Sequence, residues 1–147
     1  MAKKSAEPEK PAKTRIGTAL VVEDDPILAL SIEDTLRDAG AEEVKVCAST
    51  KQALAALEQA TPDVLVLDVH LVDRDDGWAV AELVTQLHTK PPRIIFSTGS
   101  PEAIPEGIAD MGVVLAKPYR PEALIEAIRG KQTKGFFAKL KGAISSD

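Results

Sequence analysis

Short apolar runs alternate with amphipathic segments along most of this chain. Five of the runs are continuous and consist mainly of β-branched residues and leucine, a pattern typical of strands that are buried on both faces of a parallel sheet. Because an amphipathic segment follows each run, the pattern predicts repeated β-α units. The five runs comprise residues 19–22, 44–48, 64–67, 94–96 and 113–116.

The first amphipathic segment, residues 27–39, has the clearest helix signals. Asp25 is a possible N-cap, Pro26 suits the first helical position, and Gly40 would end the helix. The fourth segment contains Pro105, which disfavours a regular helix, so we expect a short or irregular helix there. The remaining helices are predicted over residues 50–60, 78–88 and 121–129.

Five strands that alternate with five helical segments predict one α/β domain at residues 18–130. The favoured topology is a flavodoxin-like (βα)5 doubly wound parallel sheet with strand order 2-1-3-4-5. Residues 1–17 contain almost no large apolar side chain, so we expect a disordered basic arm. Residues 131–147 place apolar and basic residues at helical spacing and are interpreted as an amphipathic basic tail.

The net charge of −5 is unevenly distributed. Five basic and two acidic groups give residues 1–17 a charge of +3, and four lysines and one aspartate give residues 131–147 the same charge. Nine basic and twenty acidic groups leave −11 on the middle segment. That charge argues against nucleic-acid binding by the domain and suits a site that concentrates a divalent cation.

Apolar content limits the class of protein and its location. With 44% apolar and 28% charged residues the chain fits a globular domain, and no apolar run approaches the roughly 18 residues that span a bilayer. The N-terminus also lacks a secretory signal, so we expect a cytoplasmic protein. The single cysteine, Cys47, excludes a disulfide within the chain and is predicted to be a buried apolar residue.

Polar residues stand where the predicted strands end. The carboxyl ends of parallel strands share one edge of the sheet, where such folds bind their ligands. Carboxylates gathered there repel one another unless a cation lies among them, and Mg²⁺ binds a few carboxylates together with waters and phosphate oxygens. The sequence therefore predicts a Mg²⁺ site at which a lysine and a hydroxyl also contact phosphate. The residues are Glu23, Asp24, Asp68, Thr98 and Lys117.

These residues, in this order and each at a strand end, resemble the receiver domains of two-component response regulators over residues 18–130. The resemblance implies that Asp68 is the phosphoacceptor and that Thr98 and Lys117 assist it, with Lys117 preceding a cis proline, Pro118. It also implies a metal site. The implied Mg²⁺ ligands are Glu23, Asp24, Asp68 and the backbone carbonyl of His70, whereas Asp25 is interpreted mainly as a helix cap.

The resemblance further implies covalent chemistry and partners. Asp68 would accept a phosphoryl group from a histidine kinase or a histidine phosphotransfer protein. Self-phosphorylation and autodephosphorylation would be the only catalysis. Since only 17 residues follow Gly130, we expect a stand-alone receiver that acts as a phosphorelay intermediate, a phosphate sink or a phosphorylation-dependent adaptor. Its downstream target is not predicted.

Two positions depart from the common receiver pattern, and one run resembles a variant of it. Val72 replaces a proline in the loop after the acceptor, and Val114 replaces an aromatic residue that usually moves on phosphorylation. The run Phe96-Ser-Thr-Gly99 resembles the Phe-Ala-Thr-Gly variant of the FAT GUY receivers, a group of stand-alone and stress-signalling regulators. We therefore expect signalling to run through residues 99–107.

Other interpretations remain open. A receiver-like module could bind partners without phosphate, although the intact Asp68, Thr98 and Lys117 argue against this. An aspartate-nucleophile phosphatase is ranked last, because His70 stands where such enzymes place a second acid. The tail at residues 131–147 is predicted to be a helix docked on the domain, a partner-binding helix, or a weak contact with an anionic membrane.

Overall fold

Strands and helices alternate through residues 16–70, 78–87 and 90–130, the part of the chain that the computed structural model describes. The strands are β1 (Gly17–Val22), β2 (Ala41–Cys47), β3 (Val64–Asp68), β4 (Arg93–Thr98) and β5 (Val113–Ala116). The helices are α1 (Pro26–Asp38), α2 (Thr50–Gln59), α3 (Trp78–Leu87), α4 (Glu106–Ala109) and α5 (Pro121–Arg129), with a 3-10 helix, η2 (Pro101–Ala103), before α4.

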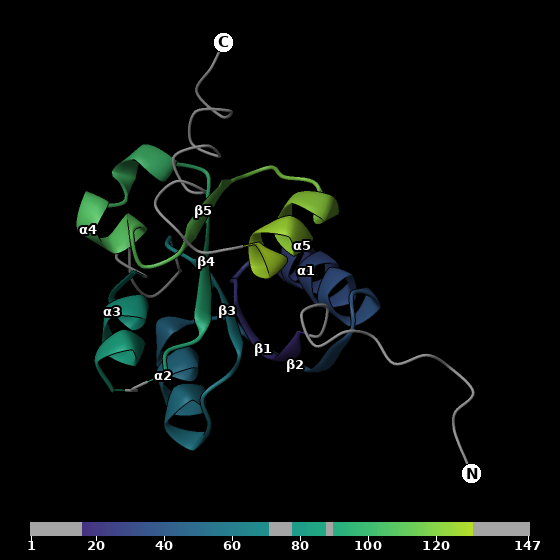
Figure 1. Cartoon of the computed structure of the whole chain (residues 1–147), viewed down its shortest axis with the longest axis horizontal. Helices are drawn as coiled ribbons and strands as arrows, with labels where there is room; N and C mark the ends of the chain where they lie inside the picture. The colour runs from purple at the N-terminus through teal and green to yellow at the C-terminus, as the bar shows by residue number, and fades with distance from the viewer. Residues whose placement is uncertain (1–15, 71–77, 88–89, 131–147) are drawn as a thin grey trace.

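The five strands form one parallel sheet in the order β2-β1-β3-β4-β5, which confirms the predicted fold (Figure 1). The chain passes from β1 outward to β2 and then returns to the other side of β1 as β3. The order of the strands therefore reverses between β1 and β3. Ligand sites of such sheets lie beyond the carboxyl ends of the two strands at this point.

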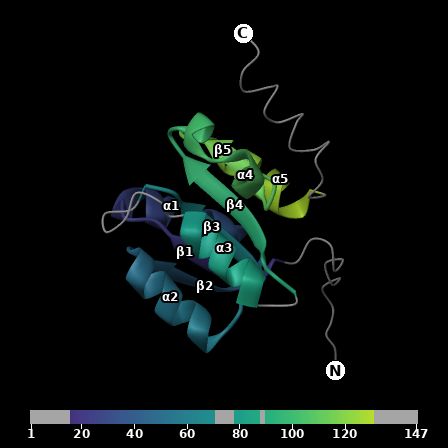
Figure 2. The ribbon, with the colours of Figure 1, turned by 90° about the vertical axis from the view of Figure 1, so that its left-hand side faces the viewer.

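Helices cover both faces of the sheet (Figures 1 and 2). Leu20 and Val22 of β1 pack into a core with α2, α3 and α4, whereas Ala19 and Val21 pack into a second core with α1 and α5. Alternate side chains of one strand thus enter opposite cores. This two-sided burial is why the strands are continuous apolar runs in the sequence.

The helix boundaries follow the signals in the sequence. Asp25 caps α1, since its Oδ1 accepts hydrogen bonds from the backbone N–H groups of Ile27 at 3.0 Å and Leu28 at 3.3 Å. The predicted irregular fourth helix is confirmed, because Pro105 separates the three residues of η2 from the four of α4. Cys47 is buried and unpaired, as predicted.

The domain begins earlier than the sequence predicted. Gly17 already belongs to β1, and Ile16 is buried, whereas the sequence pattern places both residues in the disordered arm. A single apolar residue next to a strand gives too weak a pattern to place the boundary. Residues 1–15 and 131–147 lie outside the described part, so the predicted arm and tail stay predictions. None of the described helices is long and apolar enough to cross a membrane.

The sequence gives no sign of a tight backbone contact at Gly112, just before β5. A Cβ atom added there would overlap the backbone carbonyl of Ile94, whereas one added at Gly107 would meet no described atom within 4 Å beyond its chain neighbours and its own helix backbone. We expect Gly112→Ala to lower the free energy of unfolding by roughly 1–3 kcal/mol in urea denaturation, because β4 or β5 must shift. Gly107→Ala, in α4, is the control and should be neutral or slightly stabilising.

Candidate functional site

Three carboxylates meet at the reversal point of the sheet. Glu23 and Asp24 directly follow β1, and Asp68 is the last residue of β3. One carboxylate oxygen of each lies within 4.8 Å of those of the other two, so together they could hold a metal ion. Glu23 and Asp68 are each only 3% exposed, and Asp24 is partly exposed. The structure thus brings together the predicted acidic ligands.

The main chain orients the two buried carboxylates. Oε2 of Glu23 accepts a hydrogen bond from the N–H of Asp25 at 3.1 Å, and Oδ1 of Asp68 accepts one from the N–H of His70 at 3.0 Å. The other oxygen of each carboxylate faces Lys117. Its Nζ lies 3.1 Å from Oε1 of Glu23 and 3.5 Å from Oδ2 of Asp68.

Lys117 therefore bridges the metal-ligand candidates and the predicted acceptor. Burial by itself disfavours the charged ammonium, but Glu23 and Asp68 outweigh that effect and raise the pKa of Lys117 above its usual range. The residue stays positively charged at neutral pH. Its peptide bond to Pro118 is cis, as the resemblance implied.

The ionised form of Glu23, unlike that of Lys117, is disfavoured in the folded protein. Burial is the largest effect and the nearby Asp68 adds repulsion, and together they raise the pKa of Glu23 from 4.5 to about 7 despite the Asp25 N–H and Lys117. One ammonium thus only partly balances three converging carboxylates. Hard oxygen ligands with a deficit of positive charge fit a small divalent cation such as Mg²⁺.

Thr98 ends β4 at the same edge and is completely buried. It lies next to Ser97, the register partner of Asp68. The Thr98 hydroxyl oxygen accepts a hydrogen bond from the N–H of Ser100 at 2.9 Å, and its carbonyl accepts one from the N–H of Lys117 at 2.7 Å. Thr98 therefore connects the lysine to the segment after β4.

Three other expectations concern His70, Val114 and the loop at Val72. The His70 side chain is exposed, and its backbone N–H contacts Asp68, but the role of its carbonyl as a metal ligand stays a prediction. Val114 is buried in the core beside α4 and is only 5% exposed. The altered loop at Val72 falls within residues 71–77, outside the described part.

Sequence reasoning missed one pair of residues near the site. The hydroxyls of Ser97 and Tyr119 form a hydrogen bond of 2.9 Å across the end of the sheet. Burial is the main reason that the pKa of Tyr119 is raised, and its surroundings include Lys117 and Asp68. The available signal was the position of Tyr119, an aromatic residue two places after the lysine.

Comparison with known proteins agrees with this geometry. The family model of the response regulator receiver domain matches residues 19–129. The chain therefore belongs to the response regulator receiver domain family, and the predicted resemblance to receivers is confirmed.

Two curated regulators are similar in sequence. Transcriptional regulatory protein PdtaR of Mycobacterium tuberculosis is 27% identical over 111 residues, which cover 74% of this chain and 53% of PdtaR. Phyllosphere-induced regulator PhyR of Methylorubrum extorquens is 30% identical over 105 residues, which cover 69% of this chain and 38% of PhyR. The chain thus spans about half of PdtaR or less than half of PhyR.

Solved structures show the same fold. A CheY-like receiver domain from Methylobacillus flagellatus has a TM-score of 0.67 at 22% identity, with 77% of this chain and 98% of that chain covered. The response regulator PhyR from Brucella abortus has a TM-score of 0.68 at 24% identity, with 90% and 54% covered.

The raised pKa of Glu23 predicts how stability depends on pH in the metal-free protein. The folded protein holds this proton more tightly than the unfolded chain, so the stability that Glu23 contributes is fully present below about pH 4.5 and is lost as the pH rises through about 7. With EDTA present, we expect the free energy of unfolding of wild type to fall by up to about 3 kcal/mol relative to that of Glu23→Gln between about pH 4.5 and about pH 7.

Urea denaturation across this pH range checks the prediction. Glu58→Gln, which removes an exposed carboxylate of α2, is the matched control and should follow the wild-type curve. Parallel curves for wild type and Glu23→Gln would show that Glu23 is not held in an unfavourable charged state.

Proposed function

We propose that this chain accepts a phosphoryl group on Asp68 and passes the signal to protein partners. The observation that carries the proposal is the bridge formed by Lys117, whose Nζ lies 3.1 Å from Glu23 and 3.5 Å from Asp68, in a chain of the receiver family. The bridge positions a fixed positive charge beside the acceptor oxygen. Phosphoryl transfer depends chiefly on such charge and on positioning.

The acidic pocket would hold Mg²⁺. Glu23, Asp24 and Asp68 supply oxygen ligands, and the family resemblance adds the His70 carbonyl. When bound, Mg²⁺ supplies positive charge that offsets the charge of the phosphoryl oxygens.

The transfer itself uses the chain's own groups. An Asp68 carboxylate oxygen attacks the phosphorus of a phosphohistidine. The new P–O bond forms as the P–N bond breaks, and the electron pair of the P–N bond returns to the imidazole nitrogen. The Lys117 ammonium faces the phosphoryl oxygens. Among the described residues the Thr98 hydroxyl accepts a hydrogen bond from Ser100 and donates none, so its hydrogen can be donated to a phosphoryl oxygen.

The family suggests the donor and the setting. The donor would be a histidine kinase or a histidine phosphotransfer protein in the cytoplasm. The protein would act as a phosphorelay intermediate, a phosphate sink or an adaptor, with no catalysis beyond its own phosphorylation and dephosphorylation. Of the relatives, PdtaR is a transcriptional regulatory protein and PhyR a stress response regulator.

We further propose membership of the FAT GUY receivers. Support comes from the Phe96-Ser-Thr-Gly99 run, from the valine at position 114 and from the similarity to PhyR. A buried valine cannot make the hydrogen bonds of a polar aromatic residue. The Ser97–Tyr119 bond offers a different connection between β4 and the segment after β5.

Small-molecule phosphodonors test the acceptor. Incubated with acetyl phosphate and Mg²⁺, wild type and Asp110→Ala should each gain one phosphoryl group by intact mass, and hydroxylamine should remove it as it does other acyl phosphates. Asp68→Ala should gain none. Asp110 is an exposed aspartate after α4 and controls for the loss of a carboxylate. Equal labelling of all three proteins would reject Asp68 as the acceptor.

Amide NMR tests the signalling segment. With Mg²⁺ and beryllofluoride, which imitates the phosphoryl group, we expect shifts at residues 99–107 because Thr98 is bonded to Ser100. Asp68→Ala should show none of these shifts. Unchanged amides in this segment of the wild-type protein would overturn the proposed route.

A further inference from the structure

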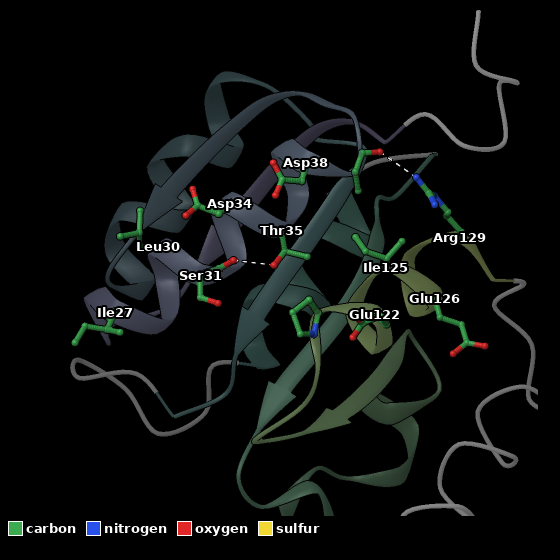
Figure 3. Close-up of a pocket in the computed structure, with 12 residues that line it drawn as sticks. Ile27, Leu30, Ser31, Asp34, Thr35, Asp38, Glu122, Ile125, Glu126 and Arg129 are labelled. Atoms are coloured by element: carbon green, nitrogen blue, oxygen red, sulfur yellow. Dashed lines mark hydrogen bonds between the residues drawn. The ribbon is translucent and has the colours of Figure 1, made fainter.

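A groove of about 960 Å³ is lined by residues of α1 and α5 (Figure 3). These two helices pack on the opposite face of the sheet from α2, α3 and α4 (Figure 1). Apolar side chains lie along the groove, and two of them are unusually exposed: Ile27 at 80% and Leu30 at 58%. Residues three apart on a helix point the same way, so these two form one apolar surface. Within the described part of the chain they remain uncovered.

Carboxylates border the groove on both sides. Asp34 and Asp38 lie on α1, and Glu122 and Glu126 lie on α5, all of them exposed (Figure 3). Arg129 is the only basic residue among the described residues that line the groove, and its Nη2 donates to the carbonyl of Ala39 at 3.0 Å. The groove therefore fits an apolar helix that carries lysines on both flanks.

We propose that this groove binds the chain's own C-terminal tail, residues 131–147. Placed at helical spacing, Phe136, Phe137, Leu140 and Ile144 share one face. Lys139 borders that face on one side, and Lys134 and Lys141 border it on the other. The tail has a charge of +3, and the groove lining has four carboxylates and one arginine, so charge and apolarity both match.

The length of the tail and the place where it leaves α5 both fit the groove. Ile27 and Asp38 are eleven positions apart on α1, which is about 16 Å of helix, and residues 134 and 144 are ten positions apart, which would be about 15 Å. The tail starts at the Asp38 end, because the neighbouring Arg129 contacts Ala39. Residues 131–133 are left to reverse the chain, so the tail would run from this end towards Ile27.

Chemical protection of the groove tests the proposal in the full chain. Leu30→Cys places a thiol on the apolar surface, and Leu87→Cys places one on α3, at a leucine that is 64% exposed outside the groove. Reaction of Leu30→Cys with a thiol reagent should be about fivefold faster once Lys139 and Lys141 are both changed to glutamate. The rate at Leu87→Cys should not change. Cys47 is 3% exposed and provides the slow background.

A charge exchange then separates docking from a general effect of the tail. Asp34→Lys with Glu126→Lys, one change on each wall, should also speed the reaction at Leu30→Cys. Combining these changes with the two glutamates of the tail should restore protection. Equal rates in all variants, or no restoration in the combined variant, would overturn the proposal.

Protein concentration identifies the occupant. Protection by the chain's own tail is intramolecular, so the reaction rate at Leu30→Cys should be the same over a hundredfold range of protein concentration. Protection that grows with concentration would mean that the tail of a second copy fills the groove, and would overturn the intramolecular proposal. The test is independent of phosphorylation at Asp68.

Discussion

The ion pairs of Lys117 with Glu23 and Asp68 are the interaction on which the site depends. Parallel strands all bring their carboxyl ends to one edge, so a sheet that ends two neighbouring strands in acids must accommodate their repulsion. Lys117, delivered by β5 from the far side of β4, offsets part of it. Burial, together with the repulsion from Asp68 that remains, raises the pKa of Glu23, and the pocket is suited to a further cation.

Each of the two cores underlies a different surface feature of the domain. The core with α2, α3 and α4 contains Val114 and reaches the segment after Thr98, where we expect the phosphorylation signal. The core with α1 and α5 lies beneath the acidic groove. Alternate side chains of each strand enter opposite cores, so the central strands pack against helices on both faces. A shift of one strand therefore changes the packing on both faces.

The fold and the placement of the main site residues could be predicted from the sequence. Two-sided burial gives each strand a continuous apolar run, and a parallel sheet then forces Glu23, Asp68 and Lys117 to one edge without any knowledge of distances. Which oxygen of each carboxylate faces the lysine could not be predicted, because backbone geometry decides it. The Ser97–Tyr119 bond was missed for a related reason: it joins two polar residues, and no sequence period relates them.

The main-chain hydrogen bond that orients Asp68, the proposed acceptor, affects which substitutions the site can tolerate. The group that holds Oδ1 of Asp68 is the backbone N–H of His70, whose side chain is exposed. Every amino acid except proline provides that donor. Substitutions at position 70 can therefore change the side chain at the mouth of the pocket while Asp68 keeps its orientation.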